Sequence, residues 1–374
     1  MTSRRIYLGA AVVMPLCLLL FMATIFGDGQ MRRLPVGVVD ADNTATSRQI
    51  VRSMEAVPTF DMAARYADDA GAREAVRRKD IYGYIFIPQG FEADVLRGAN
   101  PTLCYYYHYA LLAVGGEVMS AFETALIPVR MAPIVVEAVA TGATEEGIET
   151  FLLPLTTDDH ALYNPSLDYA VYLAVPIYYI MLQILVLLVT LYAVGSELRQ
   201  GTGAIWLRGA GGSIYRAVAG KLLPYTLIFC AQALLANMVF FHWEHIPFAG
   251  DGVLFALAAV LFVVATQAVA VILYTLFPVL ALVISVVSMV GSLGATLSGL
   301  TFPLSAMAPV VRYVAQLFPV RHFTEAMQAV VYVDGGFAAC WPMLAVLGVY
   351  PLVAVALLPR LRKLLLLHPY DTLE

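Results

Sequence analysis

The sequence predicts an α-helical polytopic membrane protein with six transmembrane helices, a re-entrant helical hairpin and an inserted α/β extracytoplasmic domain. Long apolar runs lie near the N-terminus and in residues 169–359, where they supply five of the predicted spans. Because a helix rises 1.5 Å per residue, about 20 apolar residues cross the hydrocarbon layer. Hydrophobic residues make up 60% of the 374 residues and charged residues only 13%, about half the charged share of a soluble domain.

The distribution of charge predicts how the chain divides. Residues 1–26 form the first predicted transmembrane helix, residues 27–168 an extracytoplasmic α/β domain, and residues 169–374 a five-helix transmembrane region. The middle segment contains 20 acidic and 11 basic residues. Basic residues precede the first span, separate the second from the third and follow the last, which predicts that both termini are cytoplasmic. The N-terminal run is longer than a signal-peptide core, which favours a retained helix over a cleaved signal.

The inserted domain shows alternating strand and helix patterns. Strands are predicted at 36–40, 60–66, 81–87 and 103–109, and helices at 46–56, 69–79, 90–97 and 110–150. The run at 81–87 is the clearest strand because it is short, rich in β-branched and aromatic residues, and closed by Pro88. Alternation of strands and helices predicts a partly parallel sheet.

The second half of the chain predicts five spans at 169–195, 217–241, 253–276, 279–299 and 342–358, with a tight turn at Pro278. Residues 301–340 differ from them because prolines, glycines and charged residues interrupt an apolar stretch. Broken helix at membrane depth is tolerated only against protein or water. This stretch is therefore predicted to be a re-entrant hairpin at the outer leaflet.

The sequence contains no motif that carries catalytic chemistry. It lacks a phosphate-cradling glycine loop, a nucleophile elbow and a zinc-binding histidine or cysteine set. We therefore predict no catalytic residue, no metal site and no cofactor on this chain. His242 and His245 could approach a metal, but an interfacial loop anchored by Trp243 is the simpler interpretation. A bond between Cys104 and Cys340 is conceivable, whereas buried free thiols fit the pattern better.

The predicted spans carry uncharged polar residues, which allow two interpretations. The residues are Gln183, Gln232, Asn237 and Gln267. They either form hydrogen bonds between helices, as is common in bundles, or line a translocation pathway. Because no carboxylate lies inside the predicted spans, an ion-driven pump is disfavoured and the energy for transport must come from elsewhere.

Several motifs, in order along nearly the whole chain, resemble type-2 ABC transporter permeases with a large extracytoplasmic domain. Leu34–Thr44 is similar to the opening strand and turn of that domain, Tyr84–Phe91 to its strand-to-helix step, and Tyr163–Pro165 to the approach to the second span. Glu197–Thr202 resembles the segment that contacts the ATPase. Gly299–Met307 followed by Phe318-Pro319 resembles the re-entrant segment.

Two departures concern the ATPase-contacting segment. Arg199 stands where an acidic residue is frequent in the family, and Gly203-Ala204 follows Gly-Thr where an acidic residue is usual. These departures affect the individual contacts more than the location of the interface.

The resemblance implies a transporter subunit that is not itself an enzyme. ATP and Mg would be bound by separate ABC ATPase subunits, and a second permease copy or a close paralogue would complete the translocation pathway. The implied coupling segment is 196–216, with Glu197, Arg199, Gly201, Thr202 and Trp206 as its ATPase-coupling residues. The implied gate comprises Gly299, Phe302, Pro303 and Pro319. From the residues alone, segment 196–216 fits an interfacial helix anchored by Trp206 equally well.

The function predicted on this basis is export of a drug-like, lipid-like or other amphipathic substrate across a bacterial inner membrane. The resemblance also suggests a periplasmic adaptor and an outer-membrane channel as partners besides the lipid bilayer, and no nucleic acid. The alternative is a membrane-anchored protein, either an extracytoplasmic ligand-binding protein or part of a secretion apparatus, without ATP-coupled transport. Five closely spaced C-terminal spans exceed what an anchor needs.

Overall fold

The computed structural model describes residues 9–25, 31–97, 99, 101–140, 164 and 168–367. These residues belong to two compact units, residues 1–29 with 161–374 and residues 30–160. Each unit is considered by itself below. The predictions for the first eight residues, for the part of helix 110–150 beyond residue 140, and for Tyr163 and Pro165 lie outside the described residues.

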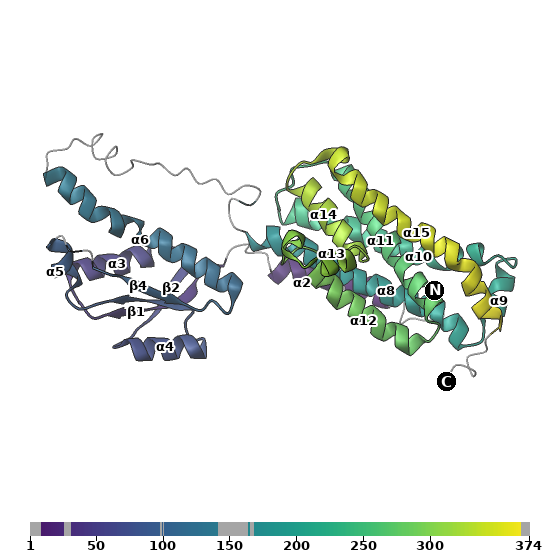
Figure 1. Ribbon diagram of the computed structural model, residues 1–374, viewed down its shortest axis with the longest axis horizontal. Helices are drawn as coiled ribbons and strands as arrows, with labels where there is room; N and C mark the ends of the chain where they lie inside the picture. Colours follow the sequence, from purple (N-terminus) through teal and green to yellow (C-terminus); the bar gives the residue numbers. More distant parts are fainter. Residues whose placement is uncertain are drawn as a thin grey trace. The chain divides into compact units, whose positions relative to one another are not determined.

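Residues 30–160 contain a four-stranded sheet with helices between its strands (Figure 1). The elements are β1 (Leu34–Asp40), α3 (Ala45–Glu55), β2 (Phe60–Arg65), α4 (Asp69–Arg78), β3 (Gly83–Ile87), α5 (Phe91–Leu96), β4 (Cys104–Tyr107) and α6 (Leu112–Ala140). The strand order is β2-β1-β3-β4. β1 pairs in parallel with β2 and β3, while β3 and β4 are antiparallel. The predicted strands and the partly parallel sheet are therefore confirmed.

The two faces of this sheet have separate apolar cores. On one face, Val36 and Val38 of β1 pack with Ile50 of α3 and Phe122 of α6. On the other face, Val39 packs with residues of α4. Successive side chains of a strand point to opposite faces, so neighbouring residues Val38 and Val39 enter different cores. Figure 1 shows α3 and α6 on the side of the sheet opposite to α4.

The carboxylate of Asp42 ties the end of β1 to the start of α5. It accepts hydrogen bonds from the Thr44 hydroxyl at 2.7 Å and from the backbone N–H groups of Gly90 at 2.8 Å and Glu92 at 3.0 Å. Burial by itself would raise the pKa of Asp42, but these hydrogen bonds outweigh burial and lower it. The charged carboxylate therefore stabilises the fold of this unit.

The other unit is a bundle of helices. Its elements are η1 (Gly9–Val13), α2 (Met14–Ile25), η2 (Ala170–Ala174), α8 (Val175–Arg199), α9 (Gly203–Gly209), α10 (Ile214–Met238), η3 (Val239–Trp243), α11 (Gly252–Leu276), α12 (Leu280–Leu297), η4 (Leu304–Ala306), α13 (Pro309–Ala315), α14 (Pro319–Val331) and α15 (Gly336–Leu367). Together with the apolar composition, these helices make the chain a polytopic helical membrane protein.

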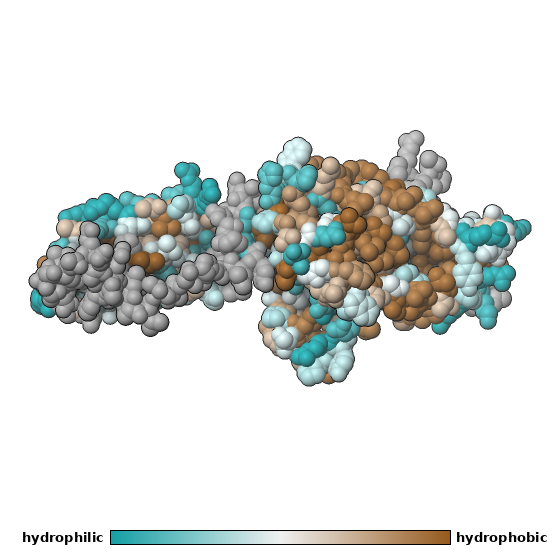
Figure 2. Space-filling model, turned by 90° about the horizontal axis from the view of Figure 1, so that it is seen from above, coloured by the Kyte–Doolittle hydropathy of each residue, from teal (hydrophilic) through white to brown (hydrophobic). Residues whose placement is uncertain are grey.

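Within the described residues, five helical segments are long and apolar enough to cross a membrane. They are 170–199, 214–243, 252–276, 280–297 and 336–366, and residues 11–25 form a shorter apolar helix. Hydrophobic residues cover most of the middle of the bundle, whereas hydrophilic residues gather at its right-hand end and in smaller patches along its other edges (Figure 2). Two helices extend well beyond their predicted spans. α8 continues past residue 195 to Arg199, and α15 continues past residue 358 and includes Arg360. These two arginines lie outside the predicted spans, because a 30-residue helix is about 45 Å long and extends past the hydrocarbon layer.

Glycines allow α12 and α8 to approach closely. A Cβ added at Gly291 would lie 2.7 Å from a side-chain carbon of Ile184, and one at Gly294 would lie 3.2 Å from the amide nitrogen of Gln183. Small residues at helix contacts let backbones come together where no water drives association. These glycines therefore set the separation of the two helices.

Residues 301–335 form short helical pieces, as the prolines and glycines predict. Residues 301–317 are exposed except for a few positions, whereas α14 is buried along most of its length. α14 packs against α11 and α15. All four cysteines are free within the structure.

Candidate functional site

The connector between α8 and α10 is a compact turn–helix–turn. Gly201 follows α8 with φ of 62°, and Gly211 and Gly212 follow α9 with φ of 65° and 76°. Glycine adopts this left-handed backbone without steric cost, so each turn is tight. The Ser213 side chain then caps α10 by accepting a hydrogen bond from the backbone N–H of Arg216 at 3.5 Å. The predicted coupling segment 196–216 thus includes the last turn of α8 and the first turn of α10.

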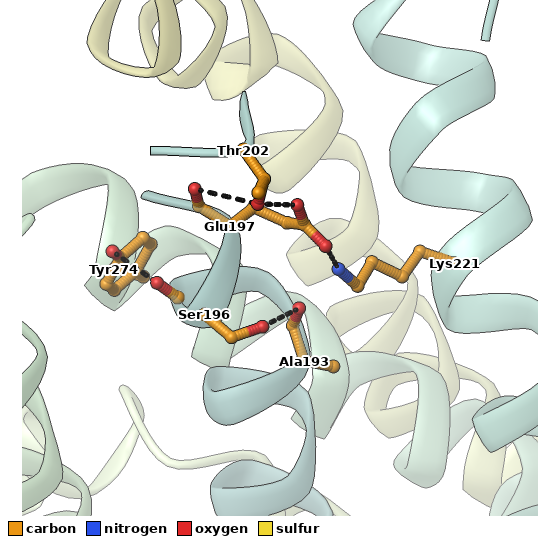
Figure 3. A network of polar contacts seen from close by, with 7 residues as sticks. Ala193, Ser196, Glu197, Thr202, Lys221 and Tyr274 are labelled. Carbon is orange, nitrogen blue, oxygen red and sulfur yellow. Dashed lines mark hydrogen bonds and ion pairs between the residues drawn. The ribbon is translucent and has the colours of Figure 1, made fainter. Parts of the chain in front are cut away.

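Two of the predicted coupling residues, Glu197 and Thr202, meet Lys221 in one polar cluster (Figure 3), and a third, Trp206, lies beside Lys221. The Glu197 carboxylate accepts a hydrogen bond of 2.5 Å from the Thr202 hydroxyl and forms an ion pair with Lys221 of α10. The Lys221 ammonium lies 4.8 Å from the centroid of the Trp206 ring. The side chains of Glu197 and Lys221 are each 20% exposed. We call Glu197, Thr202, Trp206 and Lys221 the connector cluster.

The partner that sequence reasoning missed is Lys221. It is separated from Glu197 by 24 residues along the chain, and in the sequence it contributes only to the pattern of basic residues between spans. A signal was present, because an acidic residue at the end of one helix and a basic residue near the start of the next flank a short connector. Partly buried opposite charges are rarely left unpaired. That rule would have suggested the pairing.

One side of α9 is held against the end of α15. A Cβ added at Gly203 would lie 2.9 Å from Cδ2 of Leu365 and 3.0 Å from its carbonyl oxygen. Leu207 on the same helix is buried. The opposite side presents Ile205, which is 63% exposed, and the exposed Arg208. α9 therefore has a fixed inner side and an outer side that combines apolar and basic character.

The remaining two coupling residues lie on the surface of the connector. Arg199 and Gly201 are both exposed, and neither belongs to the hydrogen-bonded cluster shown in Figure 3. Their position on the outside of the turn leaves them accessible to another protein.

The four polar residues predicted inside the spans lie at different helix contacts. Gln232 donates to the carbonyl oxygens of Ala11 at 3.0 Å and Val12 at 3.2 Å. Gln267 accepts from a threonine hydroxyl of α10 at 2.6 Å, and Asn237 accepts from a tyrosine hydroxyl of α8 at 2.6 Å. Gln183 lies against α12, and neither atom of its amide has a hydrogen-bond partner. Three of the four therefore connect helices.

The predicted gate residues lie along the path from α12 to α14. Gly299 follows α12 with φ of 85°, Phe302 is 50% exposed, and Pro303 precedes the short helix η4. Pro319 is the first residue of α14 and is buried. The first three are close in sequence, whereas Pro319 anchors the return of the segment into the bundle.

The arrangement of helices, connector and inserted sheet agrees with a sequence comparison. A family model described as ABC-2 family transporter protein matches residues 5–358. The chain belongs to this family. As an ABC-2 permease, it is a transporter component whose family implies separate ATPase subunits.

Two curated relatives of this ABC-2 permease are similar over part of their length. They are the proteins named "Probable multidrug ABC transporter permease YbhR" in Escherichia coli strain K12 and in Escherichia coli O157:H7. Identity is 24% over 202 residues, which cover 53% of this chain and 55% of each relative. The chain thus spans about half the length of the curated relatives it matches.

The side chains of the connector cluster fix helices to one another. Among the described residues, no cluster of three or more His, Cys, Asp or Glu side chains could hold a metal ion. The connector cluster joins the ends of two long helices to α9, and α9 in turn contacts the end of α15. α9 is therefore connected to three long helices, α8, α10 and α15.

Proposed function

We propose that this ABC-2 permease is the membrane subunit of an ATP-driven exporter and that segment 196–216 receives its ATPase. The single observation that carries the proposal is the connector cluster. It binds α9 to α8 and α10 through an ion pair, a hydrogen bond and a cation–π contact. The exposed Ile205 and Arg208 on the outer side of α9 supply an apolar and a basic contact for the partner.

The cluster makes the connector rigid enough to transmit a push. A short flexible loop would absorb displacement, whereas a helix held by partly buried polar contacts moves with its neighbours. Because Gly203 touches Leu365, displacement of α9 also reaches α15. Closure of two ATPase subunits around ATP and Mg would thus shift α8, α10 and α15 together.

A second copy of the chain, or a close paralogue, would contact the exposed face of α12. Exposed hydroxyl groups recur on this face at three- and four-residue spacing, at Ser285, Ser288, Ser292 and Thr296. Each hydroxyl donates to a carbonyl of its own helix. Small and hydroxyl-bearing residues are enriched where membrane helices meet. The pathway between two such faces would suit a drug-like, lipid-like or other amphipathic substrate.

The proposed orientation follows from the basic residues at the helix ends. Both termini and segment 196–216 face the cytoplasm of a bacterium, and the protein resides in its inner membrane. Residues 1–26 supply the sixth transmembrane helix, and residues 27–168 form a periplasmic domain that could dock an adaptor and an outer-membrane channel. Residues 301–340 re-enter the outer leaflet, with Gly299, Phe302, Pro303 and Pro319 as the gate.

The experiment combines partner capture with functional coupling. The full-length chain is purified from native membranes, the ATP-hydrolysing protein that accompanies it is identified, and the complex is reconstituted into vesicles. Trp206→Ala and Lys221→Met should retain ATP hydrolysis but lose most substrate-dependent transport. Val253→Ala, at an exposed position of α11 outside segment 196–216, serves as the control and should behave as wild type. Solute transport along an ion gradient without an ATPase companion would contradict the proposal.

A further inference from the structure

An arginine is buried in the first turn of α14. Arg321 is only 8% exposed, and one of its terminal nitrogens forms an ion pair with Glu325 one turn further along the helix. Its Nε is buried and has no hydrogen-bond partner. A buried guanidinium with an unmade hydrogen bond is costly. Within the bundle, a charged side chain in this condition points to a functional role.

The positive charge of Arg321 is reinforced by its position. It is the third residue of α14. Phe318, the N-cap residue just before this helix, supplies no side-chain hydrogen bond to the helix N-terminus. The N-terminus of a helix carries a partial positive charge and attracts anions. The guanidinium of Arg321 and the N-terminus of α14 together carry more positive charge than the single carboxylate of Glu325 neutralises.

The counter-ion is accessible from the outside, although the arginine is not. The side chain of Glu325 is 45% exposed, against 10% for Arg321. Along α14, the partly exposed positions are Glu325, Gln328 and Ala329, which lie on one face of the helix at i, i+3 and i+4 spacing. A ligand arriving at this face would meet Glu325 first and could take over its place at the guanidinium.

We propose that Arg321 binds the anionic headgroup of an amphiphile, a carboxylate, sulfonate or phosphate ester, and that Glu325 is the resident counter-ion which this headgroup displaces. The planar guanidinium suits bidentate binding of such groups. The apolar part of the ligand would run along the small side chain of Ala329. The inference that the bound amphiphile is the exported substrate rests on the proposed function. The inference that Arg321 binds such a headgroup does not depend on export.

The other arginine of this region serves as an internal comparison. Arg312 is exposed and donates to the backbone carbonyl oxygens of Ser305 at 3.1 Å and Met307 at 3.4 Å. It fastens an exposed loop and is not buried. Arg312→Gln therefore removes one positive charge from the same segment while leaving the Arg321 site intact.

The test measures binding to the full-length chain in phosphatidylcholine nanodiscs, without ATP or ATPase. The probe is dansyl-labelled undecanoic acid, and its uncharged methyl ester reports apolar binding alone. Wild type should bind the acid more tightly than the ester. Arg321→Gln should weaken acid binding by about tenfold, which matches the loss of one charge-assisted hydrogen-bonding site, and leave the ester unchanged. Arg312→Gln should change neither.

The direction in which the affinity for the acid changes in the Glu325→Gln variant distinguishes the proposal from a structural ion pair. This variant keeps Arg321 but removes the competing carboxylate, so acid binding should tighten by several fold, whereas a purely structural ion pair would give no change or a loss. That result decides the matter even if Arg321→Gln does not fold, and Arg321→Lys should then show intermediate affinity. Equal binding of acid and ester to wild type would also overturn the proposal.

A second arm identifies the source of the headgroup. Phosphatidylglycerol added to the nanodiscs should displace the acid if membrane lipid occupies Arg321, and should leave it bound if the site selects a free amphiphile. Because no arm requires ATP, failure of ATPase coupling would refute the proposed function while leaving this site standing.

Discussion

Replacing Gly203 by alanine tests how closely α9 depends on the end of α15. The added Cβ would lie 2.9 Å from Cδ2, 3.0 Å from the carbonyl oxygen and 3.1 Å from Cβ of Leu365. The methyl end of the leucine can rotate away, but the carbonyl oxygen belongs to the helix backbone and cannot. Overpacking of this kind costs about 1–3 kcal/mol, and alanine returns about 1 kcal/mol through its better helix propensity. The expected net loss is about 0–2 kcal/mol.

The same helix provides a matched control. Gly209, the last residue of α9, has no heavy atom within 4 Å of the position a Cβ would take. Gly209→Ala should therefore leave stability unchanged or raise it by up to about 1 kcal/mol. Both variants are compared with wild type by thermal unfolding of the full-length chain in detergent, and by substrate transport per ATP hydrolysed with the ATPase bound.

The refuting result is specific. If Gly203→Ala is as stable and as well coupled as Gly209→Ala, then α9 is not held by α15 and the route of displacement proposed above is wrong. Leu365→Ala in the Gly203→Ala background should not restore the loss, because the carbonyl contact remains and truncating a buried leucine removes apolar contacts of its own.

Three further predictions concern polar groups. In a double-mutant cycle, Glu197→Gln and Lys221→Met should show a coupling energy of about 1–2 kcal/mol in thermal unfolding, because both side chains are largely buried, and strict additivity would contradict the ion pair. Gln232→Leu should destabilise the bundle by about 1 kcal/mol through loss of its bonds to the first helix, and a more stable variant would count against that role. Asp42→Asn should destabilise residues 30–160 at neutral pH by about 2 kcal/mol. The folded-state pKa of Asp42 lies below its usual 3.8, so the stability difference between wild type and Asp42→Asn should be present above about pH 3.8 and disappear as the pH falls through the lower folded-state pKa. Hydrogen exchange of the full chain can follow this stability difference. A stability difference that persists at lower pH would refute the role of the charge.

The elements of the inserted domain were predictable because their signals are local. The strand closed by Pro88 and the helix over residues 46–56 appear within a few residues of their expected positions. Alternation of apolar residues and turn residues specifies such elements within a window of about ten residues. The prediction failed at the ends of the long helices, since an apolar run marks the part inside lipid and not the helix itself. α8 continues past its predicted end through Glu197 to Arg199, and α10 begins at Ile214, for that reason.

The candidate site was predictable in place but not in its contacts. The connector was located from its charged and aromatic residues between two spans, and Glu197, Thr202 and Trp206 do meet there. The contact between Gly203 and Leu365 joins residues that are far apart in the chain. Nothing in local sequence encodes it, because it depends on how α9 and α15 pack.

By itself, the sequence determined that the chain crosses a membrane several times, that it carries an α/β insertion, and where the connector lies. These properties follow from the length and period of apolar runs, which act within a single helix or strand. Only the tertiary structure decided which charges pair, which polar side chains bridge helices and which arginine is buried. Those outcomes depend on distances between separate helices, and side chains settle them only when the bundle packs.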